Sequence, residues 1–209
     1  MIGVVGLAMA YVVGSFPSAY IAGRMLKGID LRTLGSGNLG TTNVYREIGL
    51  GPAIVVLLVD AAKGALPVVV LPALLGVGFT GTNSSAWWAI AFGVAAIAGH
   101  AKPIFLLWNG GGKGVATAAG VFLALTPLPA LAALAAFVAI VAFTRFVSLA
   151  SMIAVLTLPA LEWFDGGASP VFLASIAVAL FVVWAHRTNL VRLRSGTEPR
   201  LGRPAGGTP

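Results

Sequence analysis

Three short segments of this chain concentrate side chains of the kinds that bind anions. The first runs from residue 35 to residue 46 and mixes glycine with hydroxyl, amide and arginine side chains. Glycine lets the backbone approach a ligand closely, and a planar guanidinium matches a phosphate group. The segment indicates an anion cradle that leads into a helix N-terminus, with a flexible connector as an equal alternative. The candidate ligand-binding residues are Ser36, Gly37, Asn38, Thr42, Asn43 and Arg46.

The second segment runs from residue 99 to residue 117 and places a glycine run before one lysine. It is not a P-loop, because Gly114 follows Lys113 where that motif requires serine or threonine. A glycine-rich loop with one lysine at the start of a helix still predicts a phosphate or carboxylate site. The alternative is that Lys113 only anchors the topology. The candidates are His100, Gly111, Gly112, Lys113 and Gly114.

The third segment runs from residue 186 to residue 202. His186 and Asn189 are three residues apart, so they share a face if the last helix continues through them. His186 could bind a hydroxyl or a phosphate group, or could simply be a polar residue at a helix end. Glu198 is the only acid in this basic tail, and we expect it to pair with a neighbouring arginine or to contact substrate.

The other ionisable residues limit the possible mechanisms. The chain has two histidines, six acids and no cysteine, which excludes thiolate chemistry and disulfides and disfavours a metal centre. There is no Gly-x-Ser-x-Gly elbow, and neither histidine begins the His-x4-Asp pattern of soluble-type glycerolipid acyltransferases. Asp60 and Lys63 fall inside an apolar run, where a mutual pair at spacing three is favoured over a functional role.

The elements that carry these segments must be membrane helices. Hydrophobic residues make up 58% of the chain and charged residues 9%, whereas a soluble domain has about a quarter charged residues. The apolar runs are continuous rather than alternating, which predicts helices and excludes a barrel. The first run has no basic start and is predicted to be a span rather than a cleaved signal peptide. The predicted spans are Ile2–Gly23, Gly49–Leu75, Ala86–Leu107, Val115–Thr126, Ala130–Thr144, Val147–Phe164 and Pro170–Ala185.

The basic residues decide the number of spans. Seven spans with the N-terminus outside place all 13 lysines and arginines except Lys63 on the cytoplasmic side. If residues 115–144 formed one long broken span, Arg145 and the basic tail would lie on the opposite side. We therefore predict an all-α, seven-helix membrane protein with a cytoplasmic C-terminus. It forms a single domain over residues 1–209, with functional loops at about 24–48, 102–114 and 186–209. Because the charge follows topology, no nucleic-acid partner is predicted.

Taken together, the motifs resemble those of the bacterial acyl-phosphate:glycerol-3-phosphate acyltransferases, the PlsY type. The resemblance covers nearly the whole chain, in order and spacing. It comprises Gly-Ser-x-Pro at 14–17, Ser-Gly-Asn-x-Gly-x-Thr-Asn at 36–43, Asp-x-x-Lys-Gly at 60–64, Gly-His-x-x-Pro at 99–103, Gly-Gly-Lys-Gly-Val-Ala-Thr at 111–117, His-x-x-Asn at 186–189 and Gly-x-Glu-x-x-Leu-Gly at 196–202. Two positions depart from the family pattern. Thr41 replaces an alanine, and Asn109 with three glycines replaces a basic residue with two.

The resemblance implies a bacterial inner-membrane enzyme that converts a fatty acyl-phosphate and glycerol 3-phosphate into lysophosphatidic acid and phosphate, the first acylation of phospholipid synthesis. It implies no metal, no cofactor and no acyl-CoA, a membrane-lipid environment, a cytoplasmic active site and a functional monomer. Ser36, Arg46, Lys113, His186 and Asn189 would contact glycerol 3-phosphate, and Ser148 would lie near them. The glycine-rich loops would receive the acyl-phosphate head. Of these residues, Ser36, Lys113, His186 and Asn189 are the predicted catalytic set.

An acyl-phosphate is an activated mixed anhydride, so the reaction needs no strong base. Holding two anions together and screening their repulsion would suffice. The proton of the attacking hydroxyl could pass to a phosphate oxygen, to His186, or through Asn189 to water. The main alternative function is a transporter for an anionic or phosphorylated solute. It is disfavoured because the polar motifs gather on one face, whereas transporters bind near the midplane.

Overall fold

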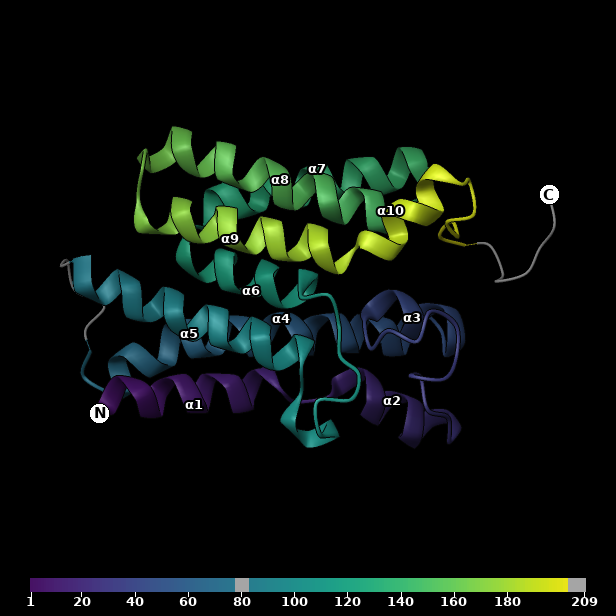
Figure 1. Cartoon of the computed structure of the whole chain (residues 1–209), viewed down its shortest axis with the longest axis horizontal. Coiled ribbons are helices and arrows are strands. Elements are labelled where there is room, and N and C mark those ends of the chain that lie inside the picture. The colour runs from purple at the N-terminus through teal and green to yellow at the C-terminus, as the bar shows by residue number, and fades with distance from the viewer. Residues whose placement is uncertain (78–82, 203–209) are drawn as a thin grey trace. The chain divides into compact units, whose positions relative to one another are not determined.

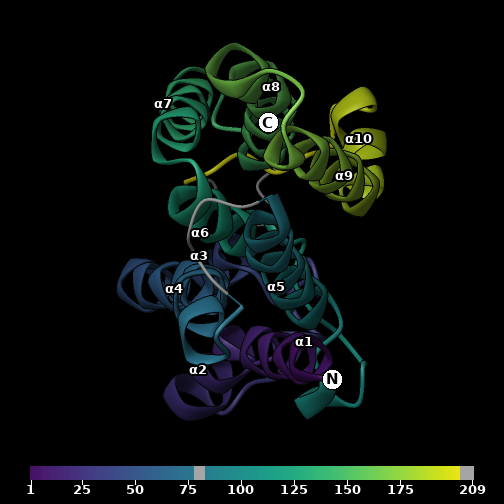
Figure 2. The same cartoon turned by 90° about the vertical axis from the view of Figure 1, so that its left-hand side faces the viewer.

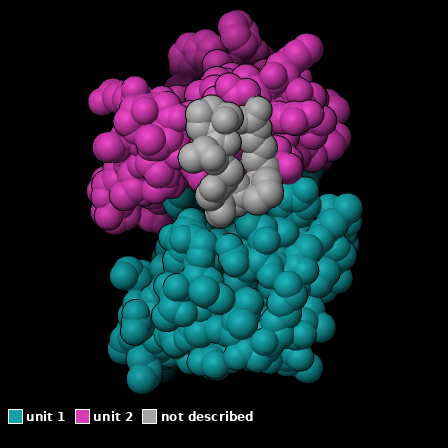
Figure 3. Space-filling model, turned by 90° about the vertical axis from the view of Figure 1, so that its right-hand side faces the viewer, with its two compact units in different colours: residues 1–125 teal, residues 126–209 magenta. Residues whose placement is uncertain are grey.

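The structure is a computed structural model that describes residues 1–77 and 83–202. Residues 78–82, between the second and third predicted spans, and Arg203 of the basic tail lie outside the described residues. All the regular secondary structure in the described part is helical, and turns and loops connect the helices. It forms two compact units, residues 1–125 and 126–209 (Figure 3).

The helices of the first unit begin with a broken pair. The predicted span Ile2–Gly23 is two helices, which together run on to Lys27. The break falls at Pro17, which has no backbone N–H to continue the first helix. In Figure 1, α1, α4, α5 and α6 run alongside one another. The elements are α1 (Ile2–Gly14), α2 (Ser18–Lys27), α3 (Thr41–Glu47), α4 (Leu50–Leu74), α5 (Asn83–Ala101), the 3-10 helix η1 (Ile104–Leu106) and α6 (Val115–Leu125).

Glycines allow two helix pairs of this unit to approach closely. A Cβ atom on Gly14 of α1 would lie 2.1 Å from the carbonyl oxygen of Ala96 on α5. A Cβ atom on Gly64, near the middle of α4, would lie 2.1 Å from the carbonyl oxygen of Thr117 on α6. Small residues at helix contacts are the usual route to tight packing in lipid, where apolar burial does not drive helix association. Because α6 starts opposite the middle of α4, the glycine segment before α6 takes the place of the additional turns that a full-length helix would have there.

The second unit contains α7 (Pro127–Thr144), α8 (Val147–Gly166), α9 (Pro170–Ala185) and α10 (Arg187–Arg194). Figure 2 views these helices from one end of the unit. The last helix does not continue straight through His186, because α9 and α10 meet there at 57°. Glu162 on α8 is 2% exposed and accepts a hydrogen bond of 2.5 Å from Thr126, the residue that precedes α7.

Five segments of the described residues are long and apolar enough to cross a membrane, and the bent pair α9–α10 is a sixth candidate. They are Ile2–Lys27, Leu50–Leu74, Ala86–Leu106, Pro127–Thr144 and Val147–Gly166. Large apolar side chains cover their outer faces, such as Leu58 at 63% and Phe143 at 89% exposed. The all-helical membrane prediction is therefore confirmed. The predicted fourth span is the helix α6, whose 11 residues reach only about 16 Å against the roughly 30 Å of a bilayer core.

Candidate functional site

The first two predicted segments meet in the first unit. The backbone N–H of Leu39 donates to the carbonyl oxygen of Gly111 at 3.1 Å. The side-chain amide of Asn38 donates to the same oxygen at 3.2 Å. Gly111 can make this approach because its φ of 142° and the closeness of Ala101, whose carbonyl oxygen would lie 2.1 Å from a Cβ atom, both exclude a side chain. The segment 35–46 and the segment 110–114 therefore form one joined pair of loops.

Asn43 closes the first loop on itself. Its Oδ1 atom accepts from the backbone N–H of Ser36 at 3.0 Å, and its Nδ2 atom donates to the carbonyls of Leu31 and Leu34 at 3.2 and 3.1 Å. The residue is 2% exposed. Both donors of the Asn43 amide are thus used within the loop, while Ser36 stands exposed at its surface. Asn43 shapes the predicted cradle through these three bonds.

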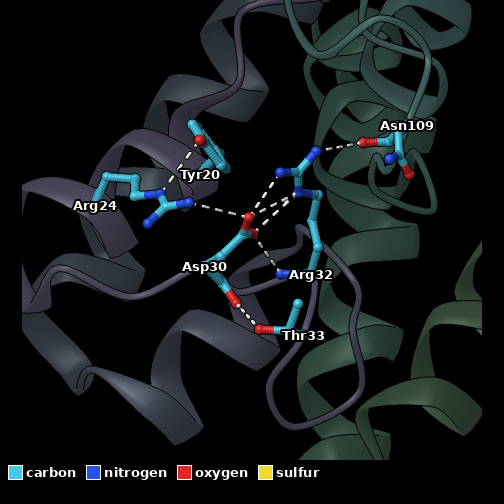
Figure 4. A network of polar contacts seen from close by, with 6 residues as sticks. All are labelled: Tyr20, Arg24, Asp30, Arg32, Thr33 and Asn109. Atoms are coloured by element: carbon cyan, nitrogen blue, oxygen red, sulfur yellow. Dashed lines mark hydrogen bonds and ion pairs between the residues drawn. The ribbon is translucent and has the colours of Figure 1, made fainter.

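An ion-pair network that the sequence reading missed supports the same loop (Figure 4). Asp30 accepts from the guanidinium of Arg32 at 2.7 Å and from that of Arg24 at 3.3 Å. Arg32 also donates to the carbonyl of Asn109 at 3.2 Å, which joins the network to the second loop. The hydrogen bond from Arg32 outweighs the effect of burial and lowers the pKa of Asp30 to about 2. The Asp-x-Arg spacing at 30–32 was the signal available in the sequence.

The two predicted cations of the first unit lie beside these loops. Arg46 is in the last turn of α3 and Lys113 directly precedes Gly114 and α6, and both are partly buried. Thr42 lies in the first turn of α3, and Gly37 and Gly114 both have positive φ angles, of 67° and 81°. The structure thus carries a lysine and an arginine on segments that flank one pair of joined glycine-rich loops.

Below the loops, the predicted Asp60–Lys63 pair is confirmed, with 2.7 Å between Lys63 Nζ and Asp60 Oδ1. Three further groups surround it. Ser18 donates to Asp60 at 2.7 Å, Lys63 donates to the carbonyl of Phe16 at 2.9 Å, and the Nδ1 atom of His100 lies 3.7 Å from Asp60. A small pocket, open to the surface, lies beside this cluster. Its wall includes Ser18, Leu39, Lys63, His100, Gly111 and Gly112.

In the second unit, Glu198 gathers the predicted polar residues. Its Oε1 atom accepts from Ser148 and from Asn189, each at 2.6 Å, and its Oε2 atom accepts from Arg192 at 2.7 Å. Burial raises the pKa of Glu198, but these three hydrogen bonds together outweigh burial and leave the pKa below its usual value. The expected pairing of Glu198 with an arginine is therefore confirmed. His186 is 4% exposed at the α9–α10 bend, and its Nδ1 atom lies 2.8 Å from the carbonyl of Val182.

The structure therefore assembles the predicted residues in two groups. The first unit brings together the segment 36–46, His100 and the segment 111–114, and the second brings together Ser148 and Asn189 with His186 nearby on the same bend. Sequence reasoning missed Ser18, whose signal was its place directly after Pro17 in the Gly-Ser-x-Pro motif. Within the described ranges 1–77 and 83–202, no three acidic or histidine side chains lie close enough together to hold a metal ion.

Comparisons with known proteins agree with one another. A family described as glycerol-3-phosphate acyltransferase matches residues 4–196. A protein of that name from Synechococcus sp. strain CC9902 is 48% identical over 196 residues, which cover 94% of each chain. One from Parasynechococcus marenigrum strain WH8102 is 47% identical over 199 residues, covering 95% of this chain and 90% of the relative.

Solved structures give the same result. A crystal structure described as PlsY, an integral membrane glycerol 3-phosphate acyltransferase, in its glycerol 3-phosphate form, matches with a TM-score of 0.85 and 34% identity over 96% of both chains. The lysophosphatidic acid form of PlsY matches with a TM-score of 0.82 and 32% identity, over 96% of this chain and 95% of the other.

Proposed function

Because the chain belongs to the glycerol-3-phosphate acyltransferase family, we propose that it transfers a fatty acyl group from an acyl-phosphate to the 1-hydroxyl of glycerol 3-phosphate. The products are lysophosphatidic acid and inorganic phosphate. Family membership gives the acceptor and the class of reaction, an acyl transfer of phospholipid synthesis within the membrane. The proposal adds the donor, the residues and the orientation of the site. We propose that the chain acts as one membrane-embedded domain and as a monomer.

The observation that carries the donor assignment is the joining of the two glycine-rich loops at Gly111. Leu39 and Asn38 both bind its carbonyl, so the backbone of both loops is held close to Lys113. Such a cradle suits the phosphate of an acyl-phosphate, which can accept hydrogen bonds from several backbone N–H groups. We assign Gly111, Gly112 and Gly114 to this phosphate, with Gly112 allowing a close approach, since its own N–H donates to the carbonyl of His100.

The two cations suit a reaction between two anions. Glycerol 3-phosphate and an acyl-phosphate repel each other, and Arg46 and Lys113 would screen that repulsion while the hydroxyl attacks the acyl carbon. We assign Ser36, Gly37, Asn38, Thr42 and Arg46 to substrate binding, with Asn43 acting through the loop that it closes. The bond between the glycerol oxygen and the acyl carbon forms as the bond between the acyl carbon and the phosphate oxygen breaks. The leaving phosphate takes up the hydroxyl proton, directly or through His186, and departs as hydrogen phosphate.

We assign Ser148, His186 and Asn189 to glycerol 3-phosphate, from the match of their motifs to the family pattern. The shared bonds of Ser148 and Asn189 to Glu198 support this, because a fixed carboxylate orients both side chains. His186 is a candidate to receive the hydroxyl proton. The contact of its Nδ1 atom with the carbonyl of Val182 fixes the ring at the α9–α10 bend, and an imidazole can take up a proton near neutral pH.

We propose seven spans, the fourth formed by the short helix α6 together with the glycine segment before it, with the N-terminus outside and the site on the cytoplasmic side of a bacterial inner membrane. The gathering of basic segments at one end of the second unit supports this orientation. In the second unit, the N–H of Leu201 donates to the carbonyl of Arg145 at 2.7 Å, and the guanidinium of Arg200 lies 5.1 Å from the centre of the Phe146 ring. Arg145 and the basic tail therefore lie at one end, as the positive-inside rule requires of cytoplasmic segments.

The test uses purified protein in detergent or lipid mesophase, with glycerol 3-phosphate and either palmitoyl-phosphate or palmitoyl-CoA. We expect phosphate release and lysophosphatidic acid only when palmitoyl-phosphate and glycerol 3-phosphate are both present. If product forms with palmitoyl-CoA but not with palmitoyl-phosphate, the donor assignment is refuted and the acceptor assignment stands. No product from either donor, in protein shown to be folded, would refute the proposed reaction.

A further inference from the structure

The buried cluster around Asp60 lies directly under the loops that the proposed reaction uses. Its members come from three helices, α2, α4 and α5, and all are nearly inaccessible. Asp60 is 1% exposed, Lys63 5%, His100 6% and Ser18 8%. A charge pair inside a membrane span is costly to bury, so its retention calls for a role in stability or function.

One oxygen of Asp60 is the centre of the cluster. Ser18 and Lys63 both lie 2.7 Å from Oδ1, and the Nδ1 atom of His100 lies 3.7 Å from the same atom. Lys63 also holds the carbonyl of Phe16 at 2.9 Å, at the break between α1 and α2. The cluster therefore joins the broken first span to α4, and one edge of the His100 ring faces its carboxylate.

The opposite edge of that ring touches the substrate loop. A Cβ atom on Gly112 would lie 1.9 Å from His100 Nε2, so the glycine backbone rests directly on the imidazole. The N–H of Gly112 also donates to the backbone carbonyl of His100 at 3.1 Å. The next residue towards the N-terminus, Gly111, carries the carbonyl that binds the first loop. The ring thus lies between the buried acid and the point where the two loops join.

We propose that Asp60, Lys63 and His100 are positioning residues: the buried pair fixes the imidazole, and the imidazole sets the backbone of Gly111 and Gly112 for binding the phosphate of the acyl donor. This inference rests on the proposed function, because it takes this segment to receive that phosphate. His100 then acts through the loop backbone. The pair is neutral as a whole, so it can serve as a rigid support inside the membrane without attracting an ion of its own.

The first test replaces both charged groups with neutral polar ones. Asp60→Asn/Lys63→Gln can still bind Ser18 and the Phe16 carbonyl, but it removes the carboxylate that faces His100. We expect kcat/KM for palmitoyl-phosphate to fall about 10- to 100-fold through a higher KM, with the KM for glycerol 3-phosphate nearly unchanged. The thermal unfolding temperature should stay within about 4 °C of wild type. Glu162→Gln is the control, since it also turns a buried acid into an amide, on α8, and should leave both KM values unchanged.

The second test uses the contact between the ring and the glycine. Gly112→Ala should lower kcat/KM for the donor about 100-fold, because its Cβ atom displaces the loop. Gly112→Ala/His100→Ala makes room for that atom and should recover at least about tenfold of the loss. Inorganic phosphate gives a readout without turnover. Phosphate should raise the unfolding temperature of wild type and of Gly112→Ala/His100→Ala, but not that of Gly112→Ala.

These outcomes separate the two proposals. A folded Asp60→Asn/Lys63→Gln protein with wild-type kinetics would overturn the positioning role. So would a Gly112→Ala/His100→Ala protein whose kcat/KM for the donor is no higher than that of Gly112→Ala. If either protein fails to fold, the other test decides. Wild type that turns over no palmitoyl-phosphate would refute the donor assignment, and the phosphate-dependent unfolding temperatures would then decide the positioning role by themselves. Phosphate that stabilises none of the proteins would overturn it.

Discussion

The side-chain amide of Asn189 donates a hydrogen bond of 2.6 Å to Oε1 of Glu198, nine residues further along the chain. The same oxygen accepts from Ser148 on α8, so a single carboxylate in the tail orients two side chains that we assign to the acceptor. The tail segment that carries Glu198 is therefore part of the architecture of the proposed site.

Replacing this carboxylate should disturb stability and binding together. Glu198→Gln keeps the size of the side chain but places an N–H donor against the donors of Ser148, Asn189 or Arg192. Each hydrogen bond to a charged group contributes about 1.5–3 kcal/mol to stability. We expect a lower unfolding temperature and at least a tenfold higher KM for glycerol 3-phosphate, measured by thermal unfolding and steady-state kinetics. Asp165→Asn, at the exposed end of α8, is the control and should change neither quantity. A wild-type KM for glycerol 3-phosphate in Glu198→Gln would show that the orientation of Asn189 by Glu198 does not affect binding of glycerol 3-phosphate.

The ion pair of Asp30 should make one part of the stability dependent on pH. The pKa of Asp30 is lowered to about 2 from an ordinary 3.8, chiefly by the hydrogen bond from Arg32. A lowered folded-state pKa gives stability that is fully present above the ordinary value and is lost as the pH falls towards 2. The difference in unfolding temperature between wild type and Asp30→Asn should be constant from pH 8 to about 5 and shrink below about 4. A difference that shrinks already between pH 8 and 6 would contradict this account.

The two proposed cations should matter for transfer and not for folding. Arg46→Ala and Lys113→Ala are each expected to lower kcat/KM by about 10²–10³, the usual effect of removing one group that stabilises a developing charge. Unfolding temperatures should remain close to that of wild type. Arg194→Ala and Lys102→Ala remove the same charges from exposed positions and serve as matched controls. Activity retained in both Arg46→Ala and Lys113→Ala would end the assignment of these roles.

The close packing of α4 on α6 predicts opposite effects for two glycine substitutions in one helix. Gly64→Ala forces a Cβ atom against the Thr117 carbonyl and should cost about 1–3 kcal/mol. Gly51→Ala meets nothing within 4 Å and should be neutral or stabilising by up to about 1 kcal/mol, because alanine favours the helix. Thermal unfolding of the two variants in one detergent measures both effects. Equal unfolding temperatures would show that the Gly64 contact relaxes without cost.

The absence of cysteine makes the topology directly testable, since single cysteines can be introduced without background. Thr33→Cys and Ser195→Cys lie at exposed positions of the basic segments, and Ala168→Cys lies at the exposed turn between α8 and α9. Seven spans with the N-terminus outside predict that a membrane-impermeant maleimide applied to whole cells labels only Ala168→Cys. Labelling of Ser195→Cys from outside would favour the six-span arrangement.

Local spacing predicted some of the contacts correctly. Asp60 and Lys63 lie three residues apart on one helix, so their pairing needs only the helical repeat. Glu198 had several arginines within reach in its own tail, and the structure pairs it with Arg192. The apolar runs likewise predicted the long helices, because only helices satisfy the backbone within lipid.

The other contacts depend on tertiary structure. The bond between Leu39 and Gly111 and the contact between His100 and Gly112 depend on how α1, α4 and α5 pack, which no local pattern specifies. The break before Pro17 was detectable in principle, because proline disrupts a helix. The apolar composition on both sides of it made one continuous span the simpler prediction.

The joining of the two loops also constrains how the protein is made. Asn38 and its partner Gly111 are 73 residues apart, so a ribosome adding 5–20 residues per second needs about 4 to 15 s to supply the partner. During that interval the first loop has been synthesised without the carbonyl that it will bind. Its glycine, serine, asparagine and threonine side chains suit this wait, because they remain hydrated in water and offer little apolar surface to a neighbouring chain.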